Sequence, residues 1–403
     1  MAPEKPATIP QNNKQTEWRA ALLEKARSYA YGRLGTEHDF DMLRVGDLHS
    51  LLKLLSSDGN IYWKQVQSDD TGRMKDFFPL CLFHQLPLYS DDKGVYIRCA
   101  DASCYLREYS YMRSMYYVLL RFCKAETAVL SRGELRQFVE YFAQSITITH
   151  VLTSQFLQFY YTYVVNSFLF FLAKDNASSL PLSTLLHSAQ LRQFAMLSDS
   201  FKDYIVPCTA LLPKYNVMYR RGDIVAYLPD NWYSPETALL LYQQFIDLDK
   251  DRDGLLKEQE LYRFNNGGLS RPFTRAVIQT LGDGIGLNFE GFLFFATAYF
   301  NLLMTEAQRH FFVLLDRDRK GALSAARVTE YMEDIVKEVA EKDGLMSVEE
   351  AVRTVFNAVH PKNPAEISLE DILASMDPCL LMTLLADYQT LHAVLYDEQG
   401  NPI

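Results

Sequence analysis

One stretch of twelve residues, 249–260, constrains the fold more than any other part of the sequence. It reads DKDRDGLLKEQE, with carboxylates at loop positions 1, 3 and 5, a glycine at position 6 and a glutamate at position 12. This spacing is typical of an EF-hand calcium loop, which lies between two helices. Apolar residues at helical spacing precede and follow the stretch. The sequence therefore predicts a helix–loop–helix unit around this loop.

The loop also predicts its own calcium ligands. Calcium binds six to eight oxygens, and an EF-hand supplies them mainly from positions 1, 3, 5, 7 and 12. The ligands predicted here are the side chains of Asp249, Asp251 and Asp253, the backbone carbonyl of Leu255 and a bidentate Glu260. Three basic residues, one of them Lys257 at position 9, lower the negative charge of the loop and predict an affinity on the order of micromolar or weaker. The alternative is an acidic surface turn that fits the pattern by chance.

Degenerate copies of the motif occur elsewhere in the chain. Residues 316–327 keep positions 1, 3 and 6, but Lys320 and Arg327 stand at positions 5 and 12, where oxygen ligands are required. Two cations directed at a cation site predict a structural hand that binds no calcium. Residues 173–184 have the length of a loop, with Leu180 at position 8, but lack the first and last carboxylates.

Two more segments supply pairing partners. EF-hands bury their inner faces in pairs, so we expect Ile367 to pair with Leu323. We also expect residues 282–291, with Leu287 and Phe289 in the β-like position, to pair with the loop containing Leu256. Two such pairs are predicted between about residues 234 and 376.

The predicted fold class is all-α, an elongated multi-EF-hand architecture with one complete and several degenerate hands. The 403 residues, 48% of them hydrophobic, can form two or three packed domains, and the aromatic run at 156–172 predicts a central core helix. The predicted segments are a disordered tail (1–16), a helical and loop-rich region (17–105), an aromatic helical region with a cryptic hand (106–230), the paired hands (231–376), and a C-terminal helix and tail (377–403).

Composition argues against several functional classes. A net charge of −10 disfavours nucleic acid as a partner, and no apolar run approaches the length of a membrane span. The polar N-terminal stretch does not read as a signal peptide, and six scattered cysteines favour reduced thiols in the cytosol or nucleus. Residues 46–49 (GDLH) and 222–225 (GDIV) resemble metallophosphatase motifs, but no Asn-His-Glu sequence accompanies them. We therefore expect no enzymatic activity.

The complete loop and its neighbours together resemble the B-double-prime regulatory subunits of protein phosphatase 2A, most closely the gamma type, and the plant Tonneau/Fass proteins are similar. The resemblance is carried by four segments and is strong from about residue 159 onward. They are the FLFFL stretch at 168–172, NWYS at 231–234, the loop with its flanks at 247–261, and VHPKNPAEISLEDI at 359–372.

The resemblance implies a non-catalytic subunit that binds calcium, docks on the phosphatase 2A scaffold and catalytic subunits and directs substrate choice. It further implies microtubule-associated or centrosomal partners, and a location in the cytoplasm, at the cytoskeleton or centrosome, or in the nucleus. The family's aromatic Ile-Pro-Arg-Phe-Tyr element is not found before Leu22. Two alternatives remain open: a free-standing EF-hand calcium sensor, and a cytoskeletal adaptor with a structural calcium site.

Overall fold

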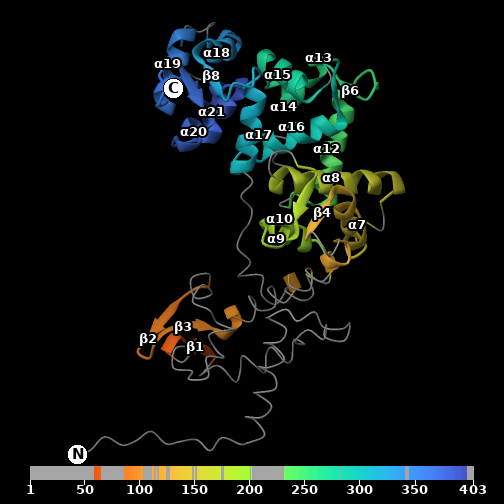
Figure 1. Ribbon diagram of the computed structural model, residues 1–403. Helices are drawn as coiled ribbons and strands as arrows, with labels where there is room; N and C mark the ends of the chain where they lie inside the picture. Colours follow the sequence, from red (N-terminus) through yellow and green to blue (C-terminus); the bar gives the residue numbers. More distant parts are fainter. Residues whose placement is uncertain are drawn as a thin grey trace, which may run out of the picture. The chain divides into compact units, whose positions relative to one another are not determined.

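The structure of the protein is a computed structural model. It describes residues 59–64, 86–102, 111–112, 115, 118–123, 128–147, 149, 152–173, 177–199, 201, 231–282, 284–340 and 345–396. The chain divides into two compact units, the first comprising residues 1–121 and 198–213 and the second residues 122–197 and 214–403. Figure 1 labels the helices and strands of both units.

The first unit contains a small antiparallel sheet that the sequence analysis did not anticipate. Its strands lie in the order β1-β3-β2 (Figure 1), with bounds β1 (Asn60–Tyr62), β2 (Tyr89–Asp91) and β3 (Gly94–Arg98). Ile61 and Ile97 face each other across β1 and β3, and both are fully buried. Strands of three to five residues are too short to show a clear alternation of apolar and polar residues, which is why the pattern predicted helices and loops here.

The second unit begins with the predicted cryptic hand. Two short strands pair so that Leu130 lies opposite Leu180, and both leucines are fully buried. Leu180 thus occupies the pairing position that its place in the sequence predicted. The elements of this region are β4 (Val129–Ser131), α7 (Arg132–Ala143), α8 (Ser154–Leu172), β5 (Ser179–Pro181), α9 (Leu182–Leu186) and α10 (Ala189–Ala195).

Helix α8 is the central core element that its aromatic sequence predicted. Tyr160, Tyr163 and Phe168 are each no more than 1% exposed. The two tyrosines remain hydrogen-bonded inside the core, because the Tyr160 hydroxyl donates to the carbonyl of Tyr233 at 2.9 Å and the Tyr163 hydroxyl to that of Trp232. These bonds join α8 to the segment that leads into the complete loop, and they satisfy polar groups that burial would otherwise penalise.

The first full pair of hands follows, and its pairing is as predicted. Leu256 lies opposite Leu287, and both are fully buried. Phe289, which was assigned to the same β-like position as Leu287, instead begins helix α16. The elements are α12 (Pro235–Leu248), β6 (Leu255–Leu256), α13 (Glu258–Leu261), α14 (Phe264–Gly267), α15 (Arg271–Leu281), β7 (Leu287–Asn288) and α16 (Phe289–Phe300).

The second pair repeats this arrangement. Leu323 lies opposite Ile367, as predicted, and both are fully buried. Helices make up most of the described residues, which confirms the all-α fold class. Among the residues that the structure describes, no helix has both the length and the apolarity needed to cross a membrane. The elements are α17 (Thr305–Leu315), β8 (Ala322–Ser324), α18 (Ala325–Val339), α19 (Val348–Val359), β9 (Glu366–Ser368), α20 (Leu369–Ala374), α21 (Pro378–Leu384) and α22 (Tyr388–Leu395).

A buried carboxyl group joins the C-terminal helices to the first pair of hands. Asp387, only 2% exposed, accepts hydrogen bonds from the Tyr299 hydroxyl, from Asn265 Nδ2 at 3.2 Å and from the backbone N–H of Gln389 at 2.7 Å. Its backbone also forms a β-bridge with Leu269. Burial raises the pKa of Asp387, while the hydrogen bonds from these donors lower it. The hydrogen bonds therefore offset only part of the solvation that the carboxylate loses on folding.

Replacing Asp387 with alanine is expected to lower the free energy of unfolding by about 2–4 kcal/mol, because the buried Tyr299 hydroxyl and Asn265 Nδ2 each lose one acceptor. The loss depends on pH. Since the pKa of Asp387 is raised in the folded state, its stabilisation is fullest below the ordinary carboxyl pKa and declines as pH rises through the folded pKa. Urea unfolding at several pH values should therefore show a larger difference between wild type and variant in acid than at neutral pH.

The exposed carboxyl of Glu370 provides the control for this prediction. Glu370→Ala is expected to change stability by no more than about 0.5 kcal/mol. A difference between wild type and Asp387→Ala that stays constant with pH would contradict the assigned role of the buried carboxyl.

Candidate metal centre

The loop at 249–260 connects α12 to α13 and takes its shape from a few backbone positions. Helix α12 begins at the N-cap Ser234, whose hydroxyl accepts from the backbone N–H of Thr237, and ends where Asp249 leaves helical geometry. Gly254 at position 6 has a φ of 82°, in the left-handed region where a side chain is disfavoured. Strand β6 follows directly and is held by its pairing with β7. The loop is thus fixed at both ends by regular structure.

Three of the predicted ligands come together. Carboxylate oxygens of Asp249, Asp251 and Asp253 lie within 4.8 Å of one another, the one group of three or more such side chains found among the described residues. Asp249 is 5% exposed, and its Oδ2 accepts from the N–H of Gly254 at 3.0 Å. Its Oδ1 is buried without a hydrogen-bond partner. A buried carboxylate oxygen without a partner is unfavourable, so this atom points to a cation as its missing partner.

Glu260 lies differently from the three aspartates. It is 8% exposed, and its Oε1 accepts from the N–H of Lys250 at 2.8 Å while Oε2 accepts from the N–H of Lys257 at 3.0 Å. Its carboxylate therefore bridges the backbone at loop positions 2 and 9 and is not part of the aspartate group. Leu255, whose N–H donates to Asp253 Oδ1 at 2.9 Å, begins β6. Ligation by Glu260 and by the Leu255 carbonyl stays a prediction.

Lys257 contributes a contact that sequence reasoning missed. Its ammonium forms an ion pair with Asp251 and a second, at 2.8 Å, with Asp253 Oδ2. These contacts hold the pKa of Lys257 well above its ordinary value, and the hydrogen bond from Lys257 is the main reason that the pKa of Asp253 is lowered. The signal was present in the spacing, because Lys257 follows Asp253 by four residues. The sequence by itself indicated only that Lys257 lowers the negative charge of the loop.

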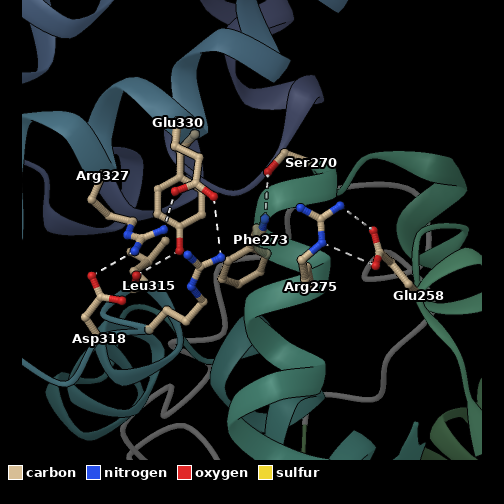
Figure 2. Close-up of polar contacts among 10 residues, drawn as sticks. Glu258, Ser270, Phe273, Arg275, Leu315, Asp318, Arg327 and Glu330 are labelled. Atoms are coloured by element: carbon tan, nitrogen blue, oxygen red, sulfur yellow. Dashed lines mark hydrogen bonds and ion pairs between the residues drawn. The ribbon is translucent and has the colours of Figure 1, made fainter. Parts of the chain in front are cut away.

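In the degenerate loop at 316–327 a basic side chain lies on an acidic one (Figure 2). Asp316 at position 1 accepts from the N–H of Gly321 at 2.6 Å, much as Asp249 does from Gly254. Arg327 at position 12 binds Asp318 at 2.8 Å and also contacts Glu330. The Arg327 side chain is 12% exposed, and its hydrogen bond is the main reason that the pKa of Asp318 is lowered. The guanidinium thus supplies positive charge within the loop. That this hand binds no calcium stays a prediction.

Other parts of the sequence interpretation fall outside the described residues. The phosphatase-like segment at 46–49 and the one at 222–225 both lie there, as does the predicted tail at 1–16.

Comparisons with known proteins agree with the resemblance that the sequence predicted. A scan against protein-family models gives no match. The chain is 29% identical over 180 residues to the gamma-type B'' regulatory subunit of serine/threonine-protein phosphatase 2A from Homo sapiens, covering 42% of this chain and 40% of that protein. The Danio rerio protein of the same name is 25% identical over 260 residues, 64% of this chain and 52% of that protein.

A plant relative and a solved structure extend this likeness. The Arabidopsis thaliana protein TON2, a probable B'' regulatory subunit of serine/threonine-protein phosphatase 2A, is 26% identical over 181 residues, 43% of this chain and 37% of that protein. The chain thus spans about half or less of the length of these relatives. A chain of a PP2A PR70 holoenzyme structure has a TM-score of 0.54 and 14% identity, covering 70% of this chain and 97% of that one. At that identity the structural likeness shows the fold alone.

Proposed function

We propose that this chain is a non-catalytic, calcium-binding regulatory subunit of protein phosphatase 2A. In this role it docks on the scaffold and catalytic subunits and directs substrate choice. The observation that carries the proposal is the similarity to regulatory B'' subunits from vertebrates and from a plant. The shared fold with a chain of the PR70 holoenzyme supports it. The recognisable chemistry of the described residues is that of cation binding by the aspartate group of the 249–260 loop.

The loop at 249–260 offers oxygen atoms, the ligands that calcium prefers. Its donors are hard oxygens, with Asp249 Oδ1 buried and unpartnered and with Asp251 and Asp253 close by. Bound calcium supplies positive charge that neutralises these carboxylates. Asp249 orients the turn through its bond to Gly254, and β6 holds Leu255 in line with its partner strand. Glu260, whose carboxylate accepts from the amides of Lys250 and Lys257, would supply the ligand at position 12.

Glu260 connects this loop to helix α13. Its carboxylate accepts from the backbone N–H groups at loop positions 2 and 9. A calcium ion in the loop would take this carboxylate, which α13 carries, as its ligand at position 12. Helix α13 contacts α15 through the ion pair of Glu258 with Arg275 at 3.1 Å (Figure 2). A change in loop conformation is therefore transmitted to α15, the next helix of the pair. This contact connects the calcium loop to a docking surface.

The decisive experiment is capture of the purified scaffold–catalytic dimer of phosphatase 2A by this chain, with calcium and with chelator. Stoichiometric capture is expected, and it should be stronger with calcium. An unrelated EF-hand sensor loaded with calcium is the control for non-specific capture. If this chain captures no more than the control in either condition, the regulatory-subunit proposal is wrong, and the free-standing sensor or cytoskeletal adaptor takes its place.

We also propose, from the resemblance, that the chain acts in the cytoplasm at microtubule or centrosomal structures. Imaging of the tagged full chain beside a centrosomal marker tests this location. A uniform distribution that ignores the marker through the cell cycle would count against it.

A further inference from the structure

The ammonium of Lys257 lies on two of the predicted metal ligands. Its Nζ is 2.8 Å from Asp253 Oδ2 and also contacts Asp251 Oδ2. Oxygens of these two residues and of Asp249 lie within 4.8 Å of one another, which leaves room for one cation among them. Calcium needs the same oxygens at about 2.3–2.6 Å. The ammonium and the ion therefore compete for one set of atoms.

The position of Lys257 is set by the fold of the loop. It directly follows β6, whose pairing with β7 fixes the backbone, and it is the N-cap of α13 with extended geometry. Its backbone N–H donates to Glu260 Oε2 at 3.0 Å. One residue thus holds Asp251 and Asp253 through its side chain and Glu260 through its backbone. The two side-chain contacts place a cation on oxygens that the predicted ligand set would give to the ion.

In the degenerate hand a basic side chain also pairs with an acidic residue of the loop, and there the basic side chain is more deeply buried. There Arg327 binds Asp318, which has the loop position of Asp251. Arg327 is 12% exposed and is also held by Glu330, whereas Lys257 is 45% exposed and has carboxylates of its own loop as its described ion-pair partners. An ion pair between exposed groups is weak and yields to a competing ion. Asp249 Oδ1, buried and without a partner, remains available to receive that ion first.

We propose that Lys257 is a tethered competitor that sets the calcium threshold of the 249–260 loop. In the absence of calcium its ammonium neutralises Asp251 and Asp253 and keeps the loop ordered. Calcium binds only by displacing it, so the affinity is lower than the four carboxylates alone would give. The inference rests on the proposed calcium binding and adds to it the residue that controls the response.

The test is calcium titration by calorimetry on the full chain after chelator treatment. Lys257→Met is expected to bind calcium about 10-fold more tightly than wild type, because the competing charge is gone. Lys250→Met is the matched control. It removes the same charge from position 2 of the same loop, where the side chain is exposed and the described ion pairs do not include it. Its affinity should rise by no more than about 2-fold.

Hydrogen exchange gives a second readout that does not depend on affinity. In chelator, the amides of residues 249–257 should exchange faster in Lys257→Met than in wild type, because the loop has lost its internal cation. In saturating calcium the two proteins should exchange alike. A variant that merely changes overall charge would show no such difference between the two conditions.

The outcomes separate this inference from the proposed function. If wild type binds calcium and Lys257→Met binds it no more tightly than Lys250→Met, the competitor role is wrong while calcium binding stands. If neither wild type nor Lys257→Met binds calcium, both proposals fail. Binding by Lys257→Met with none by wild type at the same concentrations supports the competitor role in its strongest form.

Discussion

Replacing Glu260 with glutamine is expected to weaken calcium binding by at least about 100-fold. Glu260 is the predicted bidentate ligand at position 12, and glutamine offers one neutral oxygen where glutamate offers two that share a charge. The loop would then rely on three aspartates, two of which are already neutralised by Lys257. Calorimetric titration of the chelator-treated full chain measures the change. The wild-type isotherm should fit a single site, since Arg327 occupies the other acidic loop.

Glu258→Gln is the matched control for this prediction. Glu258 lies in the same short helix, has a side chain that is 42% exposed, and makes its ion pair with Arg275 instead of with the loop. Its replacement removes the same charge and should change calcium affinity by no more than about 3-fold. Equal affinity in Glu260→Gln and Glu258→Gln would show that Glu260 keeps its backbone bonds in the presence of calcium and is not a ligand.

Replacing Phe264 with alanine is expected to lower the free energy of unfolding of the second unit by about 3–5 kcal/mol. Phe264 is fully buried at the start of α14, which connects the hand at 249–260 to α15. Its ring is 5.0 Å from that of Phe295 and 5.3 Å from that of Tyr299, measured between ring centres, and it also meets the rings of Phe292 and Phe300. Alanine removes all four contacts and leaves a cavity. Urea unfolding followed by circular dichroism gives the change.

Tyr141→Ala provides the comparison, because Tyr141 is an aromatic residue of similar size that is 46% exposed. Its loss should lower the free energy of unfolding by less than about 1 kcal/mol. If the two variants were equally stable, the cluster around Phe264 would not be the centre of the core. Calcium affinity of the folded Phe264→Ala protein also shows how far the loop depends on this packing.

The sequence was most informative where structure is local. The loop at 249–260 and the degenerate loop at 316–327 could be recognised because all residues of each motif lie within twelve consecutive positions. Pairing of Leu323 with Ile367 could be predicted because EF-hands bury one apolar residue per loop against a neighbour. The charge of Arg327 at position 12 predicts that this loop binds no calcium, and the structure adds that its guanidinium pairs with Asp318.

Tertiary structure alone decided the contacts that depend on side-chain direction or on distant parts of the chain. Nothing in the sequence showed that the Glu260 carboxylate would accept from the amides of Lys250 and Lys257, because the motif specifies ligand positions and not their hydrogen bonds. The bond of Tyr299 to Asp387 joins residues 88 positions apart, and no periodicity records such a pair.

The metal centre depends both on local spacing in the sequence and on tertiary structure. Spacing determined which carboxylates meet, because a twelve-residue turn brings positions 1, 3 and 5 together whatever surrounds it. Whether Lys257 lies on those carboxylates or points into solvent was decided by β6 and the N-cap of α13, which fix where its side chain begins. A long flexible side chain has many rotamers of similar energy, so its contacts are selected by the folded surroundings and cannot be read from its position in the sequence.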